Sequence, residues 1–333
     1  MKSLGVGRRP LQLIVPWAIS ALAILYVLNT TDWKQVMAAS GDADLPLFVL
    51  FAALDKIVFF AVWTWVQIEV IRGFVGKISR TSLISVRGAS EGFRAVNNPL
   101  ADAIFLAGTR RITRASFLVL FAALLIPFAI HFMVLLLQTT ILLPIAPAET
   151  HPDGIKLLIF LGWSLVVLFG TLWRISQRSK NRFLAKIRLW LTAVSLRQLV
   201  SYLFWFIGLA LFDVIVQGFA SRSFGINIDW WCLAARLPFL YLGLTAPSIG
   251  NFGVREFVWS TLFQDQASSD ALVAYAFSMN ALFVLFHVVI GGLFFQRAWI
   301  LLVEIRSNRR EGKSVPTLRE MFWAKTTKDD GEN

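Results

Sequence analysis

The chain has 333 residues, of which 57% are hydrophobic and only 16% are charged, and its formal net charge is +12. About a quarter of the residues in soluble domains are charged, and the apolar residues here form long blocks, so the composition excludes an ordinary soluble domain. The basic residues lie between the blocks, which indicates membrane topology rather than nucleic-acid binding.

Six apolar blocks are long enough to cross the hydrocarbon core of a bilayer, which needs roughly 20 helical residues. The first block follows Arg8 and Arg9, as in a signal peptide, but it lacks a small-residue cleavage site and is interpreted as a retained span. Backbone groups in hydrocarbon must bond within their own segment, so all six are expected to be helices. The predicted spans are 11–28, 46–71, 115–137, 155–173, 196–219 and 271–302, and the last is expected to emerge as a cytoplasmic helix.

The charge of the connecting segments alternates along the chain. The N-terminus, the segments 72–114 and 174–188 and the C-terminus are basic, whereas 138–154 has no Lys or Arg. Cytoplasmic loops carry the excess of Lys and Arg. The pattern predicts a multi-pass protein of the cell inner membrane with both termini in the cytoplasm. The basic stretch 174–190 fits either a helix lying flat on the inner leaflet or an ordinary loop.

Two moderately apolar segments, 83–108 and 232–263, are interrupted by Gly, Asn and Pro. The charge count places both ends of the first inside and both ends of the second outside, so each is predicted to be a re-entrant helical hairpin. Irregular backbone at membrane depth needs protein or a wet cavity around it. The expected fold is therefore an all-α polytopic membrane protein with six spans and two re-entrant hairpins in an inverted repeat. Its membrane domain is 1–310, with repeat halves 46–137 and 196–302, and a polar cytoplasmic tail covers 311–333.

The strongest local signal lies between Ala246 and Glu256. Pro247 is expected to stop one short helix, and Gly250 and Gly253 permit positive φ before a new helix begins near Val254. The free N–H groups of that helix, with the planar donor of Arg255, would suit an anion such as a lipid phosphate. The alternative is that Arg255 and Glu256 belong to an ordinary outer loop.

The segment Pro247–Glu256 resembles the "P-x-x-x-G-G-x-G-x-R-E" motif of the lysylphosphatidylglycerol synthase transmembrane-region family, also called the flippase-like or UPF0104 family. Asn97-Asn98-Pro99, with Asp102 and Arg110-Arg111, resembles that family's second motif, and Gly291-Gly292 near His287 resembles its terminal span. Asn251 stands where a second glycine is usual, and no glycine separates Pro99 from Asp102.

This resemblance implies a membrane module associated with lipid translocation, without the soluble aminoacyl-transferase domain of the full-length synthases. We therefore expect a translocase of a phospholipid or lipid-linked headgroup. The alternatives are a lipid-modifying transferase with a carboxylate base, and an accessory subunit of a separate lipid or glycan synthase. The expected headgroup-binding residues are Arg236, Pro247, Gly250, Gly253, Arg255, Glu256, Asn98, Pro99, Asp102 and Arg110.

Three further charges lie inside predicted spans. Asp55 and Lys56 are neighbours about 100° apart on a helix, so each is expected to need another partner. Asp213 is expected to pair with Arg236 or Arg255. No nucleotide, dinucleotide or zinc-helix motif occurs, and the single cysteine, Cys232, excludes an internal disulfide. The expected partners are membrane lipids, with no cofactor or metal.

Overall fold

The computed structural model describes Lys34 and residues 40–41, 43–76, 78–147, 154–178, 194–244, 248 and 250–310. The expected first span at 11–28, Pro247, the stretch 179–190 and the tail 311–333 lie outside the described residues. The described part is all helical. Its helices are α3 (Leu45–Val75), α4 (Arg80–Arg94), α5 (Asn98–Thr113), α6 (Phe117–Leu142), α7 (Gly154–Arg178), α9 (Leu196–Arg222), α10 (Trp230–Gly243), α11 (Val254–Leu262) and α12 (Ser269–Arg310).

Five of these helices are long and apolar enough to cross a membrane: α3, α6, α7, α9 and α12. They coincide with five of the six predicted spans and are compatible with an integral membrane protein. At about 1.5 Å per residue, the 42 residues of α12 extend roughly 63 Å, about twice the hydrocarbon thickness. Helix α12 is therefore long enough to continue beyond a bilayer, as the sequence predicts.

The four remaining helices form two short pairs, α4 with α5 and α10 with α11. Asn97 is the N-cap of α5, since its side chain accepts a hydrogen bond from the Leu100 N–H at 3.2 Å. Pro99 follows in the first turn of the helix, where proline is tolerated. Gly253 starts α11 with φ of +80°. The glycines of the segment 83–108 that were expected to interrupt it include Gly88 and Gly92, but both lie inside α4, where they permit close packing against α12.

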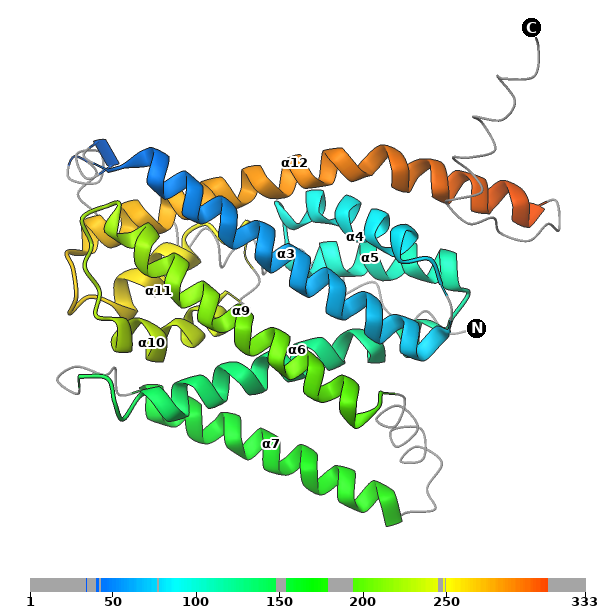
Figure 1. Cartoon of the computed structure of the whole chain (residues 1–333), viewed down its shortest axis with the longest axis horizontal. Coiled ribbons are helices and arrows are strands. Elements are labelled where there is room, and N and C mark those ends of the chain that lie inside the picture. The colour runs from blue at the N-terminus through cyan, green and yellow to red at the C-terminus, as the bar shows by residue number, and fades with distance from the viewer. Residues whose placement is uncertain are drawn as a thin grey trace, which may run out of the picture.

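The order of helices α3–α6 is repeated in α9–α12: a long helix, a short pair and a second long helix. Figure 1 shows that α3 and α9 run in opposite directions, as do α6 and α12. The packing contacts correspond as well, since α4 lies on α12 and α10 lies on α6, while α3 and α9 lie on each other. The two short pairs lie at opposite ends of the long helices, with their connections turned toward the centre (Figure 1).

The two connections meet, although they are about 150 residues apart in sequence. The Gly250 N–H donates to the Val96 carbonyl at 2.9 Å, and the Asn97 side chain donates to the Ser248 carbonyl at 3.3 Å. A Cβ atom on Gly250 would lie 2.9 Å from the Ala95 oxygen, so only glycine fits this approach and its φ of +57°. We call this contact the hairpin junction.

Two clusters of buried apolar side chains lie on either side of the junction. One gathers α10, α11 and the start of α12, with Leu233, Trp259 and Tyr275 at its centre. The other gathers the end of α3 with α4, α5 and α6, and includes Leu83 and Phe105. Each short pair is thus anchored in its own core, and the polar groups described next lie between the two.

Candidate functional site

A cavity of about 720 Å³ lies at the hairpin junction and is lined by residues of α3, α4, α5, α6, α10, α11 and α12. Its wall includes both connections, through Asn97 and Gly250, and a set of aromatic residues on α3 and α6. Charged side chains also face it, which is costly within an apolar helical assembly unless each charge has a partner. The partners of those charges therefore indicate what the cavity can bind.

One part of the cavity wall is a network of four charged side chains, which we call the Arg–Glu cluster: Arg87, Glu91, Arg94 and Asp102. Residues 87, 91 and 94 share one face of α4 because they are three and four positions apart. Glu91 lies 2.9 Å from Arg87 and 3.1 Å from Arg94, and Asp102 of α5 lies 2.7 Å from Arg94 and 3.4 Å from Arg87.

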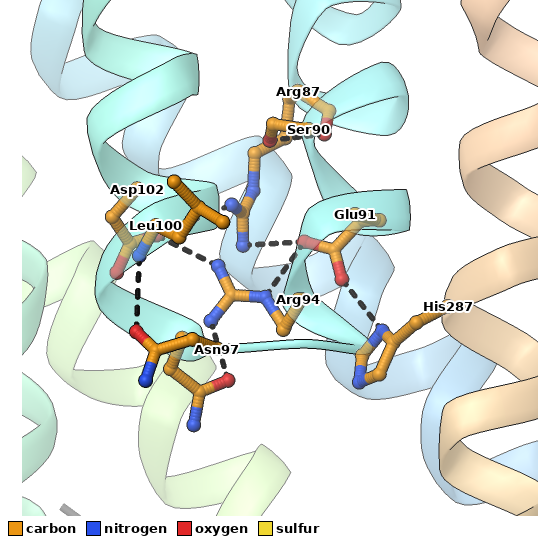
Figure 2. Close-up of polar contacts among 9 residues, drawn as sticks. Arg87, Ser90, Glu91, Arg94, Asn97, Leu100, Asp102 and His287 are labelled. Atoms are coloured by element: carbon orange, nitrogen blue, oxygen red, sulfur yellow. Dashed lines mark hydrogen bonds and ion pairs between the residues drawn. The ribbon is translucent and has the colours of Figure 1, made fainter. Parts of the chain in front are cut away.

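Two further residues complete this cluster, as Figure 2 shows in part. His287 of α12 places its Nδ1 atom 2.9 Å from Glu91, so that Glu91 lies between Arg87, Arg94 and the imidazole (Figure 2). Arg94 also donates to the Asn98 side chain at 3.2 Å. The side chains of Arg87 and Glu91 are almost fully buried, and two guanidinium groups facing two carboxylates leave this part of the cavity nearly neutral.

Two further cations, Lys56 and Arg255, line the same cavity. Lys56 of α3 places its ammonium nitrogen 3.5 Å from the centre of the Phe283 ring, and the Arg255 guanidinium lies 4.7 Å from the same ring. Contacts between cations and aromatic faces stabilise a charge only partly. The nearest carboxylate to Lys56 is that of Asp55, at 3.7 Å. This contact corrects the expectation that the two neighbours would not pair, because the long lysine side chain reaches back to the adjacent residue.

Arg255 is a buried cation without an ion pair among the described residues. Its side chain is 4% exposed and lines the cavity, yet no described carboxylate lies within 4 Å of it and its Nε atom has no hydrogen-bond partner. Glu256, the next residue, is buried in the first turn of α11 but does not line the cavity. The cavity wall thus holds two cations, Lys56 and Arg255, beyond those of the balanced Arg–Glu cluster, and the one carboxylate that contacts them, Asp55, does not line the cavity. This excess of positive charge in the wall suits an anion.

Asp213 belongs to a separate chain of hydrogen bonds. It accepts from the Tyr241 hydroxyl at 2.6 Å and from the Gln217 amide at 3.3 Å, and the Tyr275 hydroxyl donates to Gln217. The expected pairing of Asp213 with Arg236 or Arg255 is not present. The Asp213 carboxylate instead accepts hydrogen bonds from neutral donors. Tyr241, one of these donors, also lines the cavity.

Five of the residues predicted for headgroup binding do line the cavity together: Asn98, Pro99, Asp102, Gly250 and Arg255. Two others, Arg236 and Arg110, lie away from it. Arg236 is fully buried and bonds to Asp265 and to the Leu262 carbonyl, and the exposed Arg110 lies in the last turn of α5. Gly253 and Glu256 lie at the start of α11 beside the cavity, and Pro247 is outside the described residues.

Sequence reasoning missed Arg87, Glu91 and Arg94 as a unit. Arg87 and Arg94 enter the sequence analysis only as charges of the basic segment 72–114, and Glu91 does not enter it, although the three-and-four spacing of these residues indicates one face of a helix. Within the described residues, no group of His, Cys, Asp and Glu side chains could hold a metal ion.

No protein-family model matches the chain. A search of the curated proteins likewise finds no match. The resemblance of the two short motifs to the flippase-like family therefore enters the functional argument as a proposal.

Proposed function

We propose that the chain is a membrane translocase that binds the anionic headgroup of a phospholipid or a lipid-linked molecule in the cavity at the hairpin junction. The observation that carries this proposal is the buried Arg255, which faces the cavity beside Lys56 without a carboxylate partner in the described structure. A buried unpaired cation costs several kcal/mol. A phosphate held between the two cations would offset that cost.

We also propose the membrane arrangement that goes with this function. In it, α4–α5 enters from the cytoplasmic face and α10–α11 from the outer face, as re-entrant hairpins of an inverted repeat in the cell inner membrane. The repeated helix order, the opposed directions of α3 and α9 and the contact between the two connections support it. Binding sites of transporters with inverted repeats lie where such broken helices meet near the midplane.

The cavity favours binding over headgroup chemistry. Its two lining carboxylates, Glu91 and Asp102, each lie within 3.5 Å of two guanidinium groups, so neither is free to accept a proton from a substrate. Mass spectrometry of the membrane lipids of a deletion strain separates the two functions. A translocase leaves the lipid inventory intact and changes leaflet distribution, whereas a transferase removes a lipid species.

The direct test is leaflet exchange in reconstituted vesicles that contain a fluorescent anionic phospholipid. Loss of one charged contact weakens binding by about 1.5–3 kcal/mol, roughly a tenfold or greater change. We expect Arg255→Ala to slow exchange by about that factor, Arg255→Lys to slow it less, and Arg222→Ala to leave it unchanged. Arg222 is the matched control because it is an exposed arginine that stacks on Trp230, outside the cavity.

Equal exchange by the wild type and Arg255→Ala, or no exchange above protein-free vesicles, would overturn the proposal.

A further inference from the structure

One face of α6 belongs to the cavity and to the outer surface of the molecule at the same time. Phe117, Phe121, Leu125 and Phe128 line the cavity, yet 54%, 46%, 41% and 43% of their respective surfaces are exposed. They follow one another at intervals of three or four residues and therefore form one stripe on the helix. We call it the α6 stripe. Because the same side chains line the cavity and are exposed, the cavity opens to the outer surface of the described structure along this stripe.

Helix α5 supplies the facing wall of this opening. Pro99, Asp102 and Ala103 line the cavity from α5, which is joined to α6 by the three residues 114–116. The two helices contact each other, and Ala103 and Phe128 lie 11 and 12 residues from the two ends of the connection. The opening is therefore a slit between α5 and α6.

The chemistry changes across this slit. The cavity behind it is lined by charged groups, among them Arg255 and the Arg94–Asp102 pair at 2.7 Å, whereas its exposed α6 edge holds phenylalanine and leucine. A small soluble anion would need only the charged end. A molecule that fits both ends has an anionic head and a hydrocarbon tail, and the length of the α6 stripe, about 17 Å for 11 residues of rise, leaves room for part of a chain.

The charge at the end of the slit fits the same ligand. Arg110, Arg111 and Arg114 are exposed where α5 ends and α6 begins, directly before Phe117. Basic residues near a membrane surface attract anionic headgroups. Arg110, which does not line the cavity, thus stands at the rim of the slit.

We propose that the ligand is a membrane lipid with a phosphate-bearing head, which reaches the cavity sideways through the α5–α6 slit. Its phosphate is held by Arg255 and Lys56, and its hydrocarbon tails stay on the α6 stripe, in contact with the bilayer. This inference rests on the headgroup site proposed above and adds the lateral route by which the lipid reaches it and the place of its tails.

The test uses phosphatidic acid with a photoactivatable diazirine in one acyl chain, incorporated into phosphatidylcholine vesicles that contain the full-length protein. After illumination, mass spectrometry locates the labelled residues. We expect labelling concentrated on the α6 stripe and reduced by unlabelled phosphatidic acid, but not by the same amount of additional phosphatidylcholine. Helix α7 is the internal control, since its exposed apolar residues, such as Phe160 and Leu165, lie outside the cavity.

Labelling that is equal on α6 and α7, or that unlabelled phosphatidic acid does not reduce, would overturn the lateral route. This readout is independent of transport. Competitive labelling of the stripe without leaflet exchange would support lateral lipid binding and count against translocation. Leaflet exchange with labelling spread over all apolar helices would support translocation and overturn the present inference.

A second measurement closes the slit reversibly. Ala103→Cys and Phe128→Cys are introduced together on a Cys232→Ser background and bridged with a short bifunctional thiol reagent that reducing agent cleaves. We expect competitive labelling of the stripe to fall to the level of α7 when bridged and to return on reduction, while each single-cysteine variant is unaffected by the reagent. Unchanged competitive labelling in the bridged protein would overturn the proposal.

Discussion

At the scale of single residues, Glu91 determines whether two arginines can be buried in α4. It lies within 3.1 Å of both Arg87 and Arg94 and contacts His287 from another helix. Removing one partner of a buried ion pair costs about 3–5 kcal/mol because the other charge stays uncompensated. Glu91→Gln should therefore lower the thermal unfolding midpoint in detergent strongly. The measurement is fluorescence-detected size exclusion after heating.

Glu69→Gln is the matched control for that substitution. Glu69 also contacts two arginines, Arg72 at 3.0 Å and Arg80 at 2.6 Å, but these side chains are partly exposed. Exposed pairs contribute about 1 kcal/mol or less, so its midpoint should change little. Equal shifts for the two variants would contradict the structural role assigned to the Arg–Glu cluster.

The sequence predicted part of the cavity at residue level. The predicted residues that line the cavity lie close to the two connections between the short helices, where the backbone and the flanking side chains come together. They are Asn98, Pro99, Asp102, Gly250 and Arg255. Arg236 was assigned by proximity to the second break, but its long side chain turns to Asp265. Which way a guanidinium points depends on tertiary partners, and no local spacing encodes that.

At the scale of helices, the crossing of α4 and α12 depends on two glycines. A Cβ atom on Gly291 would overlap the backbone of Gly92, whereas one on its neighbour Gly292 would meet no atom within 4 Å. Gly291→Ala should therefore force the helices apart and lower the folded yield and unfolding midpoint. Gly292→Ala should be neutral or stabilising by about 0.5–1 kcal/mol, since alanine favours a helix over glycine. A similar loss in both variants would contradict this account of the crossing.

The hairpin junction gives a second prediction at this scale. Because the Asn97 side chain lies 3.3 Å from the Ser248 carbonyl, Asn97→Cys and Ser248→Cys on a Cys232→Ser background should form a cross-link on mild oxidation. The pair Asn97→Cys and Ser268→Cys is the control, because Ser268 directly precedes α12 and its side chain accepts a hydrogen bond from the Ala271 N–H instead of contacting the junction. Gel mobility before and after reduction gives the measurement. A cross-link in the control pair, but none between positions 97 and 248, would contradict the contact between the two connections.

Helix positions were more predictable than helix junctions. The five long helices follow from the length of apolar runs, and the breaks follow from Asn97, Pro99 and Gly253, whose backbone preferences are local. The meeting of Gly250 with Val96 is a contact across about 150 residues. It requires the packing of α4 on α12 and of α10 on α6, which hydropathy does not specify.

At the scale of the whole molecule, the proposed inverted repeat makes a prediction about sidedness. If each short pair enters and leaves on one face, then both ends of α4–α5 lie on one side of the membrane and both ends of α10–α11 lie on the other. Single cysteines at Ser79 and Ser116 should thus react with an impermeant maleimide only in inverted membranes. Single cysteines at Asn227 and Ser268 should react only in intact cells, all on a Cys232→Ser background.

The ends of each pair serve as controls for each other in this experiment. Helices α4 and α5 together have 31 residues, enough for two antiparallel passes of about 23 Å each but not for two complete spans of roughly 30 Å. Ser79 and Ser116 labelled from opposite faces would mean that the pair crosses the membrane, and the junction would then lie away from the midplane. With labelling from the same face, the contact between Gly250 and Val96 joins two hairpins from opposite leaflets, and the cation-lined cavity beside it is where a headgroup can be passed from one to the other.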